Sequence, residues 1–249
     1  MHPGTAALER GLRILHVLGE REHAVPGLTV SQLADVMATD KSQISRTLAT
    51  LAKQGFLDRD RRTKAYRLGP QIYLLGARTL EARLLRLAPP ILRALVHDLG
   101  ESAHLTVLQD DQVLTLYSES PPATALVAPA RVGGLTPLAT TSAGRVLATA
   151  LTTEDLTALG FSTEAIAAVD RSRADGFAIV REEFESGLVA AAAPVIGPDG
   201  CTVAAINISA PAFRFADRLE DAARQAQVAA ALLSRGLTEH SALPMSQEH

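Results

Sequence analysis

The chain has 249 residues, 47% of them hydrophobic and 20% charged, which is typical of a folded globular protein with one large or two modest domains. Its net charge of -3 argues by itself against a nucleic-acid partner, but residues 1–70 hold 11 Lys and Arg against 7 Asp and Glu. Residues 71–249 hold 13 against 20, so a basic segment precedes an acidic one. A single cysteine excludes an internal disulfide framework, and the absence of a membrane-spanning run or secretory segment predicts a cytoplasmic protein without a membrane partner.

Residues 6–19 predict a first helix, because leucines recur along them at helical spacing. We expect its buried stripe to consist of Leu8, Leu12, Leu15 and Leu18. A polar loop containing Pro26 and Gly27 follows and leads into the next helix.

Two further helix starts lie close together and predict a helix–turn–helix. Thr29 with Gln32 forms a capping box, and Asp40, again with a glutamine three residues later, caps the next helix. Apolar residues at helical spacing follow each cap and define inward faces: Leu33, Ala34 and Met37, then Ile44, Leu48 and Leu51. The opposite face of the second helix carries side chains that can bond base edges, and we expect base reading from Ser42, Gln43, Arg46 and Thr50.

Residues 56–68 predict a hairpin, or wing, with a basic tip. Apolar pairs flank residues 58–64, which include four basic side chains. We expect the DNA backbone to be held by Lys41, Arg59, Arg61, Arg62 and Lys64. Amphipathic helix pairs also occur in many all-α proteins, and basic hairpins are often only solvated tips. The wing and the charge asymmetry nevertheless favour DNA binding.

Residues 71–88 predict a linker helix that ends at the Pro89-Pro90 pair. Its apolar stripe includes Ile72, Leu75 and Leu80 and has no obvious core of its own to fill. A partner subunit is therefore the expected cover, the alternative being that the helix packs back on its own domains.

The remaining chain predicts an α+β ligand-sensing architecture. We expect helices at residues 91–99, 143–151, 153–159, 162–174 and 217–237, and strands at 103–109, 113–118, 126–132, 177–180, 189–195 and 202–209. The last two strands are almost continuously apolar, as in strands covered on both faces. The expected domains are a winged helix–turn–helix at residues 1–70, the linker helix at 71–88, an effector domain at 89–238 and a disordered tail at 239–249.

Thr140, Thr141 and Ser142 open a predicted helix, whose free N–H groups can receive an anion. Little supports the alternative of an enzyme. The seven histidines have no metal-ligand spacing, and no Gly-x-Ser-x-Gly, P-loop or dinucleotide motif is present. His104 could line a pocket or be a satisfied core histidine. We therefore expect no catalytic, metal or cofactor site.

The chain resembles the IclR family of bacterial transcription regulators over nearly its whole length. The resemblance depends on the order and spacing of several blocks: residues 8–15 (LERGLRIL), 66–69 (YRLG), 132–138, 141–145 (TSAGR), 182–187 (EEFESG) and 192–195 (AAPV). It implies a winged helix–turn–helix, a linker helix, and a GAF-like effector domain with a mostly antiparallel sheet flanked by helices. It also implies a homodimer or dimer of dimers on a palindromic operator in double-stranded DNA.

The resemblance further implies an effector site at Thr140, Thr141, Ser142, Ala143 and Gly144. Four other positions correspond to ligand-contacting positions of the family: Val180, Ala190, Asn207 and Ser209. Family members that bind small polar acids often have an acidic residue in place of Val180 and a cysteine in place of Ala190. Two serines are common where this chain has Asn207 and Ser209, and a histidine is common at Ala139. The expected ligand therefore has an apolar body, while core packing remains the alternative for these positions.

The sequence thus predicts a ligand-responsive, DNA-binding transcriptional regulator, more readily a repressor than an activator. Its expected effector is a small organic acid or related metabolite with an apolar body. The alternatives are a sensor whose winged helix mediates protein contacts and, less readily, an enzyme.

Overall fold

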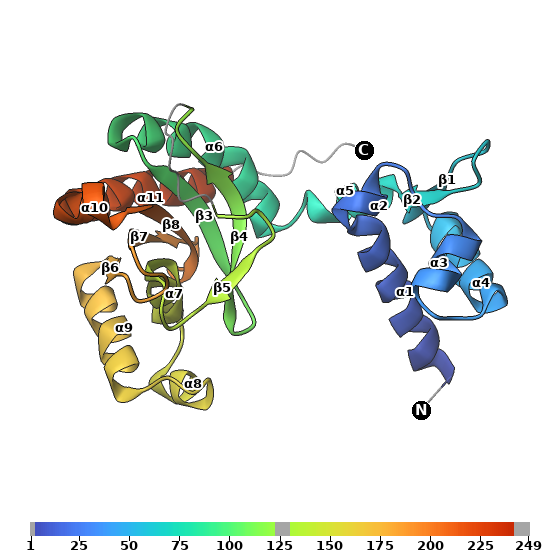
Figure 1. Cartoon of the computed structure of the whole chain (residues 1–249), viewed down its shortest axis with the longest axis horizontal. Helices are drawn as coiled ribbons and strands as arrows, with labels where there is room; N and C mark the ends of the chain where they lie inside the picture. Colours follow the sequence, from blue (N-terminus) through green and yellow to red (C-terminus); the bar gives the residue numbers. More distant parts are fainter. Residues whose placement is uncertain (1–2, 123–129, 242–249) are drawn as a thin grey trace. The chain divides into compact units, whose positions relative to one another are not determined.

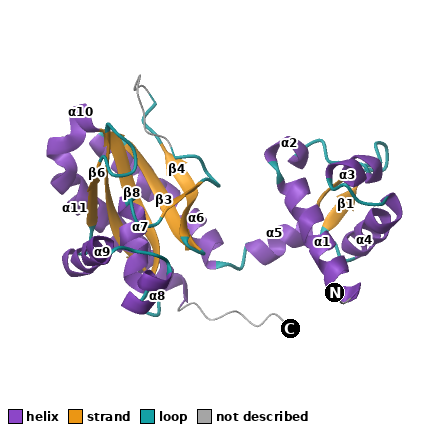
Figure 2. Cartoon of the chain, turned by 60° about the horizontal axis from the view of Figure 1, so that its bottom comes forward, coloured by secondary structure: helices purple, strands orange, loops and turns teal. Residues whose placement is uncertain are grey.

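The computed structural model describes residues 3–122 and 130–241, and the chain divides into two compact units, Met1–Ala82 and Arg83–His249. The boundary between the units lies inside the predicted linker segment at residues 71–88. Helices and strands are labelled in Figure 1, and Figure 2 distinguishes them by colour.

The first unit is a helix–turn–helix followed by a two-stranded hairpin. Its elements are α1 (Pro3–Gly19), α2 (Arg21–Ala24), α3 (Val30–Val36), α4 (Lys41–Lys53), β1 (Leu57–Arg59), β2 (Tyr66–Leu68) and α5 (Pro70–Gly76). The predicted capping box of Thr29 and Gln32 is present, and Asp40 accepts hydrogen bonds from the backbone of the first turn of α4. Leu57 pairs with Leu68 in the antiparallel hairpin. Ile44 and Leu48 are fully buried, so the predicted inward face of α4 is confirmed.

The predicted stripe of α1 is wrong at two of its four positions. Leu18 is buried and Leu15 packs against the core, but Leu8 is 65% exposed and Leu12 is 51% exposed. The inward face instead runs through Gly11, Ile14 and Leu18, which follow one another at three- and four-residue steps. The spacing of the leucines thus predicted an apolar surface of the helix but not which part of that surface is buried.

The predicted single linker helix is two helices, and the second continues through the proline pair. The first helix, α5, ends at Gly76. The second, α6 (Leu80–Leu99), includes Pro89 and Pro90 within its length. The prediction that prolines would end the helix was wrong because burial outweighs the lost hydrogen bonds. The buried stripe of α6 is continuous across the prolines and consists of Leu84, Ala88, Leu92, Leu95, Val96 and Leu99.

The second unit is built on a six-stranded antiparallel sheet in the order β5-β4-β3-β8-β7-β6. The strands are β3 (Ser102–Gln109), β4 (Gln112–Glu119), β5 (Leu135–Pro137), β6 (Ala178–Arg181), β7 (Leu188–Ile196) and β8 (Thr202–Pro211). Part of the strand predicted at 126–132 lies outside the described residues. Its described part, residues 130–132, is not a strand, and the edge strand β5 begins later. The apolar runs of β7 and β8 are explained by helices on both faces of the sheet (Figure 1).

Different helices cover the two faces of the sheet. On one face, α11 (Leu219–Ser241) packs against β7 and β8, and α6 lies beside it. On the other face, α7 (Ser142–Leu147) packs against β7 and β8. The smaller elements are η1 (Ala148–Ala150), α8 (Thr153–Ala158), α9 (Thr163–Asp175), α10 (Ala212–Phe215) and η2 (Ala216–Arg218). Residues 239–241 of the predicted tail belong to α11, and residues 242–249 lie outside the described residues. The α+β class and antiparallel sheet are confirmed.

Candidate functional site

The polar face of α4 carries the four predicted base-reading side chains, and all four are exposed: Ser42, Gln43, Arg46 and Thr50. The Asp40 carboxylate orders the start of this helix by accepting hydrogen bonds from the Ser42 hydroxyl and from the backbone N–H groups of Ser42 and Gln43. These hydrogen bonds, led by that of the Ser42 hydroxyl, lower the pKa of Asp40. The helix therefore begins at a fixed residue, which fixes which side chains face outward.

Three of these side chains are engaged locally, which leaves one unengaged. Ser42 donates to Asp40, Arg46 Nε donates to the Ser42 carbonyl at 3.3 Å, and Thr50 Oγ1 donates to the Arg46 carbonyl at 3.1 Å. Within the described part of the chain, the Gln43 amide forms no side-chain hydrogen bond. Gln43 is therefore the side chain most directly available to a base edge.

The wing presents its basic side chains on a stiff turn. Asp60 accepts hydrogen bonds from the backbone N–H groups of Arg62 at 2.8 Å and Thr63 at 2.7 Å, and these contacts, led by Thr63, lower its pKa. Lys64 has a φ of 61°, which completes the turn in a conformation that is unusual for a side chain of this size. Arg59 lies over the ring of Tyr66, 5.4 Å from its centroid. The predicted backbone-contacting residues are all exposed: Lys41 at the start of α4, and Arg59, Arg61, Arg62 and Lys64 on the wing.

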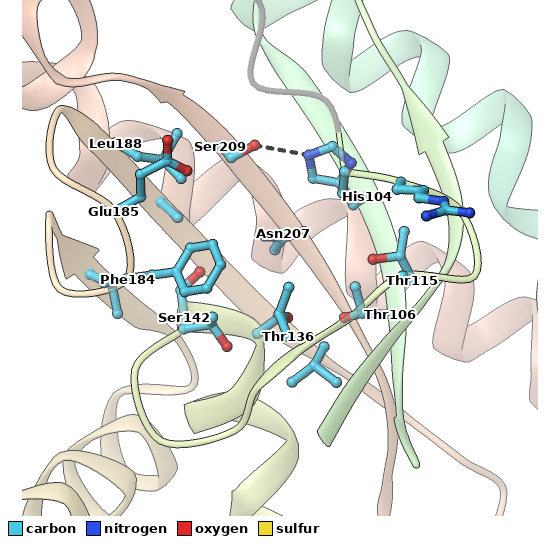
Figure 3. A pocket seen from close by; sticks show the side chains of 18 of the residues that line it. His104, Thr106, Thr115, Thr136, Ser142, Phe184, Glu185, Leu188, Asn207 and Ser209 are labelled. Atoms are coloured by element: carbon cyan, nitrogen blue, oxygen red, sulfur yellow. Dashed lines mark hydrogen bonds between the residues drawn. The ribbon is translucent and has the colours of Figure 1, made fainter. Parts of the chain in front are cut away.

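The second unit contains a cavity of about 870 Å³ between the sheet, the start of α7 and the loop from residue 182 to 187 (Figure 3). Seven of the nine predicted effector residues line it: Thr141, Ser142, Ala143, Val180, Ala190, Asn207 and Ser209. Thr140 and Gly144 are absent from the described residues that line the cavity. Thr141 caps α7 by accepting from the Gly144 N–H at 3.0 Å and donates to the Pro137 carbonyl at 2.8 Å.

Gly144 has a packing role that its sequence position did not reveal. A Cβ atom added there would lie 2.0 Å from the carbonyl oxygen of Leu138. The start of α7 therefore approaches the preceding main chain at a distance that only glycine allows. The predicted helix start is correct, but Gly144 positions the lining residues instead of lining the cavity itself.

Several lining residues were not predicted because they meet only through sheet pairing. Thr106 and Thr115 are paired on neighbouring strands β3 and β4, and both are buried. His104, left open between a pocket and a core position, is both: it lines the cavity, and its ring is hydrogen-bonded. Its Nδ1 lies 2.9 Å from Ser118 Oγ and its Nε2 lies 2.8 Å from Ser209 Oγ. The sequence alone could not show that β3 pairs with β4 and β8, which supply Ser118 and Ser209 as the hydrogen-bond partners of His104.

The loop at residues 182–187 covers part of the cavity and is tied down at several points. Phe184 and Glu185 of this loop line the cavity, as Figure 3 shows. The Glu182 carboxylate accepts from the Gly187 N–H at 2.8 Å, and Glu182 itself has a φ of 59°. Glu183 forms an ion pair with Arg145 of α7. The ion pair between Glu183 and Arg145 therefore connects the loop to α7.

Two residues that line this cavity each have a buried polar atom without a hydrogen-bond partner. The atoms are Oγ of Ser142 and Oδ1 of Asn207. A buried polar atom without a partner loses its hydration without compensation, so such atoms in native structures call for an explanation. Both atoms are enclosed by the protein, so they are not themselves exposed to the cavity.

One group of three potential metal ligands lies on the surface of the first unit. Among the described residues, Glu20, Glu22 and His23 come within 4.8 Å of one another, with both carboxylates exposed. His23 Nε2 lies 3.5 Å from Glu20 and 3.6 Å from Glu22, which is accounted for as a surface ion-pair cluster. In the described part of the chain, none of the helices is both long and apolar enough to span a membrane.

Comparison with known proteins covers both units. Residues 7–61 match the IclR helix-turn-helix domain, and residues 78–235 match the C-terminal domain of bacterial transcriptional regulator IclR. The Pca regulon regulatory protein of Pseudomonas putida is 30% identical over 82% of this chain and 73% of its own length. The transcriptional repressor IclR of Escherichia coli is 27% identical over 85% of this chain and 82% of its own length. A crystal structure of an IclR homolog from Microbacterium hydrocarbonoxydans, complexed with 4-hydroxybenzoate, has a TM-score of 0.73 at 21% identity, covering 94% of this chain and 99% of that one.

Proposed function

The chain belongs to the IclR family of bacterial transcriptional regulators, and on that basis we propose that it binds a palindromic operator as a homodimer or dimer of dimers in the cytoplasm. The family consists of DNA-binding regulators and not of enzymes. We propose repression as the direction of control, which is supported by the related repressor of Escherichia coli. A small organic acid with an apolar body is the proposed effector.

The observation that carries the DNA-binding proposal is the exposed face of α4 beside a rigid basic wing. Gln43, with Ser42, Arg46 and Thr50, would read bases, because a helix of this kind fits the major groove. Lys41 and the four basic side chains of the wing would bond phosphates, which carry no sequence information. Base reading and backbone binding are thus assigned to separate side chains.

The salt dependence of binding tests this assignment. Operator-like duplexes are first selected from a random-sequence pool, and the affinity is then measured by fluorescence anisotropy at several salt concentrations. If each of the five basic side chains neutralises one phosphate, log K should fall with log salt with a slope of about -4.5 per DNA-binding unit. A slope near zero, or a pool from which nothing is enriched, would favour the alternative in which the winged helix contacts protein.

The cavity of about 870 Å³ supports the effector proposal, since its lining combines apolar side chains with hydroxyl, amide, imidazole and charged groups that could orient a ligand. Val180 and Ala190 make their part of its wall apolar, which suits a ligand with an apolar body. The structural relative complexed with 4-hydroxybenzoate supports a carboxylate ligand of this size. A thermal-shift screen with aromatic, aliphatic and keto acids tests the class, because a ligand that binds only the folded state raises the melting temperature.

A further inference from the structure

Arg131 brings a positive charge to the lining of the cavity. It lies in the turn that precedes β5, and it is the only lysine or arginine among the described residues that line the cavity. Glu185, in the loop at residues 182–187, is the acidic residue of the same described lining. Both residues are exposed, so both charges can be reached from solvent.

The main chain around Arg131 is fastened to the sheet. The Gly134 N–H donates to the Arg131 carbonyl at 2.8 Å, and the Gly133 N–H donates to the Thr115 carbonyl at 2.9 Å. In return, the Thr115 N–H donates to the Gly134 carbonyl at 3.1 Å. Thr115 is a buried residue of β4 that also lines the cavity. The base of the Arg131 side chain is therefore held beside the cavity by backbone hydrogen bonds.

The guanidinium group of Arg131 is not engaged by the protein. Within the described part of the chain, it forms no hydrogen bond and no ion pair. Other arginines of the second unit do bond a carboxylate or a main-chain carbonyl: Arg145, Arg173, Arg181, Arg214 and Arg218. A guanidinium has five N–H donors in a planar fork that matches the two oxygens of a carboxylate. Arg131 thus has its full donor capacity left for a ligand.

We propose that Arg131 binds the carboxylate group of the effector, its guanidinium donating hydrogen bonds to both carboxylate oxygens. The inference rests on the proposed function, because it takes the ligand of this cavity to be an organic acid. It makes Arg131 a specificity-determining residue that selects acids over neutral molecules of the same shape.

The other polar groups of the lining compensate a carboxylate less well. The helix α7 has only six residues, so few peptide dipoles add up at its start, and its Gly144 N–H already donates to Thr141 Oγ1 at 3.0 Å. Both ring nitrogens of His104 lie within 3 Å of serine hydroxyls. A carboxylate that leaves water needs a positively charged, hydrogen-bonding partner, and Arg131 offers both properties.

Matched acids and amides test the proposal with the full-length chain. The probes are benzoate with benzamide, phenylacetate with phenylacetamide, and cyclohexanecarboxylate with cyclohexanecarboxamide, all measured by ligand-observed NMR. In the natural protein at least one acid should bind about tenfold more tightly than its amide. This is the lower end of the range for hydrogen bonds to charged groups, because solvent screens an exposed arginine. In Arg131→Gln the preference should fall below about twofold, while amide binding stays within about twofold of its natural value.

Three further variants separate the role of Arg131 from general effects. Arg131→Lys keeps the charge but not the planar fork, so its preference for acids should lie between those of the natural protein and Arg131→Gln. Arg224→Gln removes an exposed arginine of α11, on the other face of the sheet, and should keep the natural preference. Glu185→Gln removes the opposite charge from the same lining and should not weaken acid binding.

Thermal melting of the ligand-free chain checks that the Arg131 side chain is free. Because its guanidinium has no partner among the described residues, Arg131→Gln should melt within about 2 °C of the natural protein. A larger fall in the melting temperature would show that the protein itself uses this side chain, and would overturn the proposal.

Each outcome of the binding experiment decides the question. Equal binding of acids and amides, or no detectable binding of any acid at millimolar concentration, overturns the proposal. So does an acid preference that survives in Arg131→Gln, or one that is lost equally in Arg224→Gln. DNA selection with the same protein preparation is independent of these probes. Failure of the acid test with intact DNA selection refutes this inference alone, whereas absent DNA selection refutes the proposed function.

Discussion

Replacing Gly144 by alanine sets helix propensity against packing, and the two effects predict changes in the stability of the folded protein that are opposite in sign. In the interior of a helix, glycine is less favourable than alanine by about 0.5–1 kcal/mol, so propensity alone predicts a more stable protein. The structure predicts the reverse. The new Cβ would lie 2.0 Å from the Leu138 carbonyl oxygen, 2.6 Å from its carbon and 2.7 Å from its Cα.

The destabilisation is expected to be large because the atoms that the new Cβ would meet belong to the main chain of Leu138. Non-bonded heavy atoms pack at about 3.5 Å, so the backbone at Leu138 or the start of α7 must move by more than about 1 Å. Overpacking of this kind costs about 1–3 kcal/mol, and we expect the upper end because no side chain can rotate away. For a domain of this size, about 3 kcal/mol lowers the melting temperature by roughly 6–12 °C.

Differential scanning calorimetry of the full-length chain measures this effect. Gly236→Ala is the control, because its Cβ would meet the flexible end of Leu87 at 3.3 Å within the long helix α11. We expect that variant to lie within about 1 kcal/mol of the natural protein. A Gly144→Ala variant as stable as the natural protein would refute the close approach, and with it the placement of Ser142 and Ala143 on the cavity wall.

Three further predictions concern the DNA-binding face and the cavity. Gln43→Ala should cost about 1–3 kcal/mol on a selected duplex and relax base preference, whereas Arg61→Ala should weaken all sequences alike; equal losses on selected and unrelated duplexes in anisotropy titrations would contradict base reading by Gln43. The lowered pKa of Asp40 means that its contribution to stability is present above its ordinary pKa near 4 and is lost as the pH falls through the lower, folded-state value. Asp40→Asn, which keeps a capping oxygen, should therefore reduce the acid sensitivity of the first unit in circular dichroism melts between pH 7 and pH 2, and an unchanged pH profile would count against the carboxylate cap. Ala190→Trp should place a bulky ring in the cavity and abolish thermal shifts by acids while DNA affinity stays within about twofold, and a retained thermal shift would place the ligand elsewhere.

The parts of the fold that the sequence predicted depend on local rules. Capping at Thr29 and Asp40 and the apolar runs of β7 and β8 are properties of neighbouring residues, and they determined the element boundaries within a few positions. The exposure of Leu8 could not be predicted in this way, because periodicity identifies an apolar face but not its cover. The continuity of α6 through Pro89 depended equally on non-local burial.

The candidate site shows the same division between local and distant information. The start of α7 was found from hydroxyl residues preceding a helix, and Asn207 and Ser209 were found through the family resemblance. Thr115 lines the cavity because β4 pairs with β3 and shifts register between Leu105 and Thr106, which no local pattern announces. Phe184 depends on the path of a loop. Pairing and loop geometry, more than residue type, decide which side chains line the cavity.

The proline pair in α6 has a consequence for the stability of that helix. Neither Pro89 nor Pro90 has an amide hydrogen, so the carbonyl groups of Leu85 and Arg86 lack their usual helical donors. Two successive rungs of the helical ladder are therefore missing near the middle of α6. The helix is held together at this point by side-chain packing, because Leu84, Ala88 and Leu92 are fully buried on both sides of the proline pair. The middle of α6 thus depends on the core of the second unit for its stability more than on the helix's own hydrogen bonds.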